Sequence, residues 1–156
     1  MTREPRGWMV FTSIVALFLT VLPLPGWLDH VRPAFVVLTV LYFSITWPRA
    51  GGIGLGFFCG VALDALQGPV IGEHALVLSA LAFIGVWEHQ RIRSKPAFQQ
   101  SLIVFFALAL YEFLLFLVDA WTGHPNTDVR RWLHIFTGAM IWPIAIALLE
   151  RGHSPR

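Results

Sequence analysis

Charged side chains are scarce in this 156-residue chain, which has 11 Lys and Arg and 9 Asp and Glu, together 13% of its residues. A typical soluble domain has about 25%, and its surface needs those charges in water. Apolar residues make up 56% of the chain and the mean hydropathy is +0.68. Disordered chains are also excluded, because they are poor in apolar residues. The composition therefore indicates an integral membrane protein.

Cysteine is almost absent, and so are the patterns that mark catalytic sites. The single cysteine, Cys59, excludes an internal disulfide and a multi-cysteine metal site. The 6 histidines form no HExxH pair, so we expect no metal and no other cofactor. The chain has no nucleophile elbow and no glycine-rich phosphate loop, which predicts that it is not an enzyme. A net charge of +2 without a basic stripe excludes nucleic acid as a partner.

Long uncharged runs are what the chain has instead. A bilayer core about 30 Å thick needs about 20 helical residues to cross it, and strand-like alternation is absent. The runs predict an all-α integral membrane protein with six transmembrane helices in a single polytopic domain, residues 1–156. We expect the spans at about residues 8–28, 33–48, 51–67, 70–90, 97–121 and 132–149.

Basic residues predict the orientation of these spans, because Lys and Arg near the ends of spans stay in the cytoplasm. With six spans, 8 of the 11 basic residues lie on the same side of the membrane as the N-terminus. The other three are Arg32, Arg130 and Arg131. Both termini are therefore expected in the cytoplasm.

Glycine and aspartate recur at every fourth position in one stretch, at Gly56, Gly60, Asp64, Gly68 and Gly72. On a helix, this spacing puts Gly56, Gly60 and Asp64 on one face. Glycine on such a face lets a second helix approach closely. We expect Gly72 to lie in the turn after the helix. The face is either a packing seam inside this chain or a binding surface for a partner's transmembrane helix.

Acidic residues inside a membrane are costly, so each needs a physical reason to be there. The predicted spans place such residues in the outer half or at the outer boundary: Asp64, Glu73, Glu112 and Asp119. They can pair with the arginines on that side, bind a partner protein, or relay protons or cations. We hypothesise that Asp64 pairs with Arg32 and fixes the outer end of the hairpin between the second and third helices.

The order and spacing of these features resemble one known family. Besides the glycine and aspartate series, the chain has further elements in the expected order: Arg32-Pro33 at the start of the second predicted helix, Glu112 and Asp119 in the fifth, and Ile141-Trp142-Pro143 in the last. Nearly from end to end, the chain resembles the rod shape-determining MreD family. That family is similar in fold to the six-helix substrate-binding subunits of energy-coupling-factor vitamin transporters.

The resemblance implies a non-enzymatic, multi-pass component of the bacterial cell-elongation machinery in the inner (cytoplasmic) membrane. Such a protein would help to maintain rod cell shape by linking the MreB cytoskeleton and MreC to peptidoglycan synthesis. The implied partners are MreC, as the most direct one, MreB, a class B penicillin-binding protein and RodA, besides membrane lipid. The alternative is a small-molecule (vitamin-type) binding subunit or transporter, with an outer pocket that the acids line for a cationic ligand.

Overall fold

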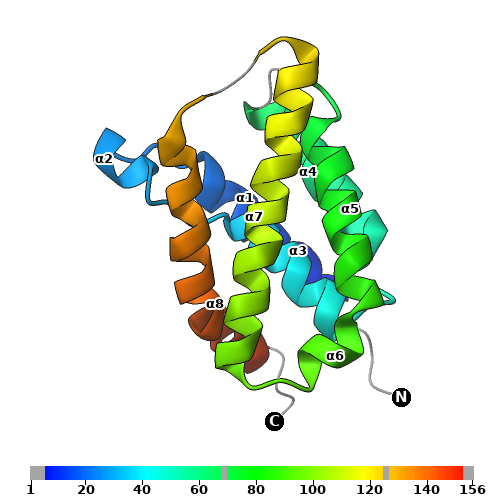
Figure 1. The fold of residues 1–156 in the computed structure, drawn as a ribbon. Coiled ribbons are helices and arrows are strands. Elements are labelled where there is room, and N and C mark those ends of the chain that lie inside the picture. The colour runs from blue at the N-terminus through cyan, green and yellow to red at the C-terminus, as the bar shows by residue number, and fades with distance from the viewer. Residues whose placement is uncertain (1–5, 68–69, 125–126, 153–156) are drawn as a thin grey trace.

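The computed structural model describes residues 6–67, 70–124 and 127–152. The regular elements in these residues are helices, without a strand, so the all-α prediction is confirmed. In chain order they are α1 (Arg6–Val21), α2 (Gly26–Asp29), α3 (Phe35–Thr46), α4 (Ile53–Gln67), α5 (Glu73–Trp87), α6 (His89–Arg93), α7 (Ala97–Thr122), the 3-10 helix η1 (Val129–Trp132) and α8 (Leu133–Arg151). The longer helices pack into one bundle (Figure 1).

Each of the six predicted spans overlaps one longer helix: α1, α3, α4, α5, α7 or α8. Two segments of the described chain, Ala97–Thr122 and Val129–Arg151, are long and apolar enough to cross a membrane. The other four helices are apolar but have only 12 to 16 residues. At about 1.5 Å per residue they reach about 18–24 Å, less than a bilayer core of about 30 Å. The count of six spans stays a prediction.

The first predicted span, 8–28, is not one helix. Helix α1 stops before Pro23 and Pro25, and the single turn α2 follows them. Proline lacks a backbone N–H and disfavours helical backbone in the residue before it, so two prolines this close together end the helix. The fourth predicted span, 70–90, is also divided, because α5 ends before Glu88 and α6 begins after it.

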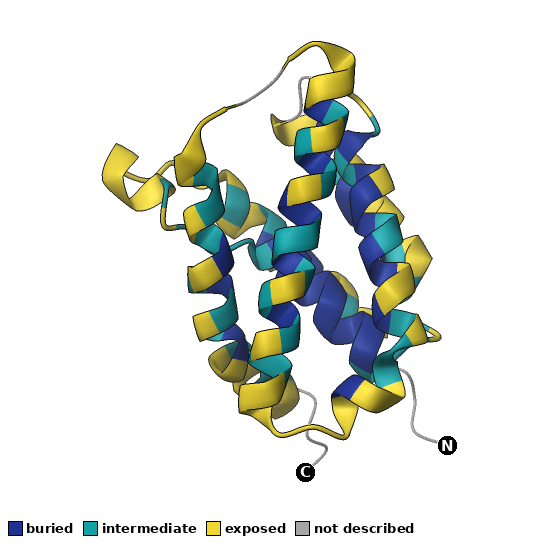
Figure 2. Ribbon diagram, in the orientation of Figure 1, coloured by how far each residue is buried: buried dark blue, intermediate teal, exposed yellow. Residues whose placement is uncertain are grey.

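Helix α3 lies at the centre of the bundle. Every residue from Val36 to Ile45 is buried, as the dark ribbon in Figure 2 shows, and α3 contacts α1, α4, α5 and α8. A helix that is apolar on all sides suits this position. The turn after α3 is tight: the Ser44 hydroxyl donates a hydrogen bond to the Gly51 carbonyl oxygen, 2.6 Å away. A Cβ atom on Gly51 would overlap Phe43.

The outer helices expose apolar side chains to the surroundings. On α8, residues spaced four apart are 58–78% exposed, namely Phe136, Met140, Ile144 and Leu148. Figure 2 shows exposed stretches recurring along this helix. On α7 the corresponding exposed residues are Leu102, Phe106, Phe113 and Leu117. Continuous apolar surface of this kind is suited to lipid chains or to the helices of a partner rather than to water.

Candidate functional site

The glycine series lies in a close contact between α4 and α5. A Cβ atom on Gly56 would come within 2.6 Å of the Leu78 carbonyl oxygen, and one on Gly60 would overlap the Ala75 backbone. The two helix backbones therefore touch, which only glycine permits at these two positions. Gly54, two residues before Gly56 and on the opposite side of α4, has no neighbouring atom within 4 Å of the same hypothetical Cβ, so the requirement is local to the seam.

The aspartate of the series ends this seam by capping the next helix. The Asp64 carboxylate accepts hydrogen bonds from the backbone N–H groups of Gly72 and His74, each 2.9 Å away, and of Ala75, 3.2 Å away. His74 Nδ1 lies 2.9 Å from the same carboxylate. The first N–H groups of a helix have no partner within it, and a negative charge there is favourable. Asp64, on α4, thus does for α5 what an N-cap residue normally does.

The other two glycines of the series, Gly68 and Gly72, follow Asp64 in the chain. Gly72 is the N-cap residue of α5 and has a φ of +98°, a left-handed conformation that glycine adopts without strain. Because Gly72 turns the chain there, its N–H can reach Asp64. Gly68 lies outside the described residues.

The hypothesis of an Asp64–Arg32 ion pair is wrong. The Arg32 guanidinium donates hydrogen bonds to the carbonyl oxygens of Thr20 and Leu22 and lies 3.6 Å from Asp29. Thr20 and Leu22 lie at the end of α1, where carbonyl groups lack helical partners and attract cations. Asp64 is meanwhile satisfied by the N–H groups at the start of α5, so it needs no arginine as a partner.

A second polar cluster joins α7 to η1 and to the first turn of α8. Arg131 Nε lies 2.7 Å from Glu112 Oε2 and Arg131 Nη1 lies 3.0 Å from Asp119 Oδ2. His134 Nε2 lies 2.7 Å from the other oxygen of Glu112. The two acids are seven residues apart, about two helical turns, so they lie on one face of α7. Both residues are buried, and the guanidinium compensates the charges that their burial would otherwise leave unpaired.

Sequence reasoning placed Arg131 among three possible arginines but assigned no role to His134. Its spacing, three residues after Arg131, is the signal that could have found it, because both side chains then lie on the same side of a helical turn. Glu112 and Asp119 were singled out as acids inside a span, and the structure brings both of them to Arg131.

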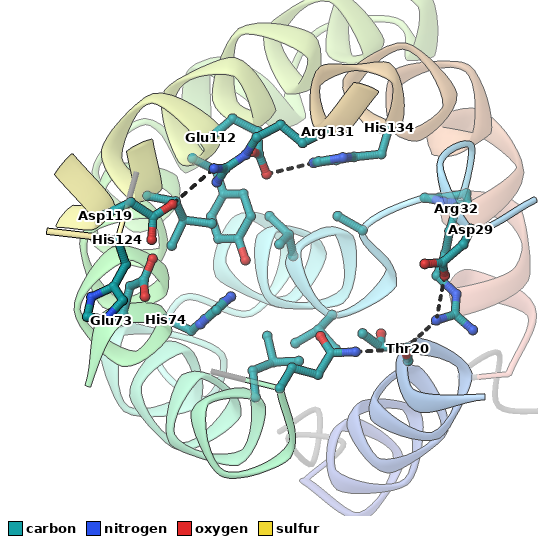
Figure 3. A pocket seen from close by; sticks show the side chains of 18 residues that line it. Thr20, Asp29, Arg32, Glu73, His74, Glu112, Asp119, His124, Arg131 and His134 are labelled. Carbon is teal, nitrogen blue, oxygen red and sulfur yellow. Dashed lines mark hydrogen bonds and ion pairs between the residues drawn. The ribbon is translucent and has the colours of Figure 1, made fainter. Parts of the chain in front are cut away.

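These groups line a cavity of about 570 Å³ between the start of α3, the start of α5 and the last turns of α7 (Figure 3). Its charged lining residues are Asp29, Arg32, Glu73, Glu112, Asp119 and Arg131. Val36, Val37 and Leu63 add apolar surface. No three His, Cys, Asp or Glu side chains among the described residues are grouped to hold a metal ion. The arrangement is suited to binding a polar or charged group.

Comparison with known proteins gives the family. A profile of the family described as rod shape-determining protein MreD matches residues 3–151. The chain belongs to the MreD family. The rod shape-determining protein MreD of Haemophilus influenzae is 30% identical to it over 155 residues, which cover 96% of this chain and 94% of that protein. No solved structure matches, so the likeness to the energy-coupling-factor subunits stays a prediction. MreD proteins are shape-determining components and not a known enzyme family.

The elements that suggested the MreD family lie at contacts between helices. Arg32 closes the end of α1, and Glu112 and Asp119 hold Arg131. Trp142 on α8 is 1% exposed, and its indole Nε1–H donates to Gln100 Oε1 on α7, 3.4 Å away. The features that carry the MreD likeness in this chain therefore hold the bundle together.

Proposed function

We propose that this MreD-family protein is a non-enzymatic, multi-pass component of the bacterial inner membrane that helps to maintain rod cell shape. The observation that carries the proposal is the family match over residues 3–151, together with a rod shape-determining relative aligned over nearly the full length of both chains. The exposed apolar side chains of α7 and α8 support a membrane location.

The two ends of the bundle differ in charge, which supports an orientation with both termini in the cytoplasm. Arg49 and Arg93 line a second cavity, of about 550 Å³, at the α6 end, and Arg91 lies in the same helix as Arg93. The opposite end holds the acidic cavity. Because basic residues stay on the cytoplasmic side, we place the α6 end inside the cell and the cavity at the outer face.

The proposed partners are those of the cell-elongation machinery. MreC is the most direct one, and MreB, a class B penicillin-binding protein and RodA belong to the same assembly. The described connections between helices are short, so membrane-embedded partners would contact exposed helix faces, and a cytoplasmic filament would contact the basic end. The role is that of a scaffold linking cytoskeleton and peptidoglycan synthesis.

The cavity favours a second candidate, a small-molecule (vitamin-type) binding subunit or transporter. Its volume of about 570 Å³ lies within the usual range of small-ligand pockets, about 300–1,000 Å³.

Depletion of the protein from a rod-shaped host separates the two candidates. We expect cells to widen and become round in rich medium, because the elongation machinery loses a membrane component. Re-expression of the intact chain should restore rods. Cells that remain rods and stop growing only without a particular nutrient would contradict the shape role and favour uptake.

A further inference from the structure

The second cavity, of about 550 Å³ at the α6 end, has a basic lining. It lies between the turn that follows α3 and helix α6, which pack at the same end of the bundle (Figure 1). We call it the basic cavity, and its lining residues are Thr46, Trp47, Pro48, Arg49, His89, Gln90 and Arg93. Among these described residues there is no aspartate or glutamate, so two arginines from separate elements line one space without an acid.

Backbone and core contacts hold both arginines at this cavity. In the turn that carries Arg49, the Gly51 N–H donates a hydrogen bond to the Trp47 carbonyl oxygen, 2.8 Å away. On α6, Ile92 is buried in the hydrophobic core, and α6 contacts α3. The positions of Arg49 and Arg93 on the backbone are therefore set by the fold, before any ligand is present.

Neither cavity arginine is neutralised by an acidic side chain of the described residues. Arg91, in the same helix as Arg93, lies 3.3 Å from Glu88 Oε2. Within the described part of the chain, Arg49 and Arg93 have no aspartate or glutamate at ion-pair distance. Glu150, near the end of α8, belongs to the same part of the bundle, but it lies beyond that distance and does not line the cavity. Arginine stays charged at neutral pH, so both guanidinium groups can pair with an external anion.

A phosphate group suits two arginines from different elements. Guanidinium groups donate parallel hydrogen bonds to phosphate oxygens. Trp47 lines the cavity, and Phe83 and Trp87 are exposed in the last two turns of α5, just before α6. Tryptophan is enriched at the level of lipid headgroups, and basic pockets between membrane helices on the cytoplasmic side bind anionic headgroups. These surroundings favour a lipid phosphate over a soluble one.

We propose that the basic cavity binds the phosphate group of an anionic membrane lipid, held between the Arg49 and Arg93 guanidinium groups. The Gln90 amide adds a neutral donor, and the acyl chains extend toward the exposed Phe83 and Trp87. The inference rests on the proposed membrane location and on the placement of the α6 end at the cytoplasmic side. It goes beyond both by assigning a ligand to named residues, and it does not depend on the shape-determining role.

The test is lipid-dependent stabilisation of the purified full-length protein in detergent, followed by far-ultraviolet circular dichroism at about 0.15 M salt, where charges more than about 8 Å apart are largely screened. The probe is dioleoyl phosphatidylglycerol, added to the micelles in increasing amounts. Dioleoyl phosphatidylcholine has the same chains but a cation beside its phosphate, and glycerol 3-phosphate is a soluble phosphate. A ligand that binds only the folded state raises the melting temperature in a saturable way. We expect this effect from phosphatidylglycerol alone.

Substitutions then locate the site. Arg49→Gln and Arg93→Gln should each weaken the binding of phosphatidylglycerol about tenfold, because each removes one charge-assisted contact. Both residues are exposed, so the melting temperatures without lipid should stay close to that of wild type. Arg91→Gln is the matched control: it removes the same charge from the same helix, but Arg91 pairs with Glu88 and does not line the cavity. It should leave binding within about twofold of wild type.

Each contrary result overturns the proposal. Equal stabilisation by the two lipids would show that a negative headgroup plays no part. Equal weakening by Arg91→Gln and Arg93→Gln would show that the overall charge of this end matters and not the cavity. Saturable stabilisation by glycerol 3-phosphate at the same concentrations would assign the cavity to a soluble phosphate compound.

A fourth outcome points to a protein. If neither lipid binds but Arg49→Gln cells lose rod shape, the cavity instead receives an acidic side chain of a partner protein. Because lipid binding is measured in detergent, it can fail or succeed independently of the depletion experiment.

Discussion

Replacing Asp64 by alanine removes the side chain that caps the start of α5. Three backbone N–H groups, of Gly72, His74 and Ala75, then lose their acceptor. Loss of a cap costs about 0.5–2 kcal/mol, and each buried donor left without a partner adds about 1–3 kcal/mol. Gly72 and His74 are only partly buried, so water satisfies part of the loss. We therefore expect Asp64→Ala to destabilise the fold by about 2–4 kcal/mol.

Asp64→Asn separates the hydrogen bonds from the charge. The amide keeps one oxygen acceptor in nearly the same place but loses the second acceptor and the negative charge at the start of α5. We expect a smaller loss of stability, about 1–2 kcal/mol. The order wild type, asparagine, alanine follows from the capping role.

Thermal unfolding of the purified variants in detergent, followed by far-ultraviolet circular dichroism, measures these losses. A loss of 1 kcal/mol lowers the melting temperature of a chain this size by about 2–4 °C, so Asp64→Ala should melt about 4–16 °C below wild type. Asp29→Ala is the matched control, because the Asp29 side chain is 60% exposed, and removing an exposed ion pair costs about 0–1 kcal/mol. If Asp64→Ala melts no lower than Asp29→Ala, the capping role is refuted.

Three further predictions follow from the contacts and charges. Gly60→Ala should lower the expression level and the melting temperature, because its Cβ would overlap the α5 backbone. Gly54→Ala is the control, because the space around Gly54 is open. Equal stability of the two variants would contradict the close contact between α4 and α5. Arg131→Gln should destabilise the protein by about 3–5 kcal/mol, because it removes the cation beside buried Asp119 and leaves buried Glu112 with His134 alone. Arg130→Gln, at an exposed neighbouring position, should be close to neutral in the same unfolding assay. Alkaline phosphatase fused to the C-terminus should be inactive, since we place that end in the cytoplasm, and strong activity would overturn the orientation.

The helices were largely predictable because uncharged runs mark them directly. Every predicted span overlaps one longer helix. The predicted ends of the helices were less accurate where backbone chemistry, rather than hydropathy, determines where a helix stops. Pro23 and Pro25 stop α1 although the run of apolar residues continues, and α5 gives way to α6 at Glu88. A hydropathy profile contains no information on either break.

The partners of the polar residues were much harder to predict. The spacing placed Gly56 and Gly60 on one face, but it does not identify α5 as the helix that packs there. Matching acidic with basic side chains led to Arg32 as the partner of Asp64. Almost every residue has a backbone N–H group, so the sequence does not show which of these groups is free to bind a carboxylate. The choice between Arg130 and Arg131 was open as well, since neighbouring residues have equal charge. The turn of η1, in which Asp128 accepts from the backbone N–H of Arg130, decides it.

The short central helix has a consequence for how the chain enters a membrane. With 12 residues, α3 extends only about 18 Å. The helices that pack around α3 are synthesised partly before it and partly after it. Helix α5, one of the helices that cover α3, is synthesised more than twenty-five residues later. Until then α3 has neither the length to anchor itself nor the helix whose Gly85 lies against its buried Ser44. Stable insertion of α3 therefore has to wait for the later helices, so a chain truncated before α5 should be extracted from the membrane or degraded.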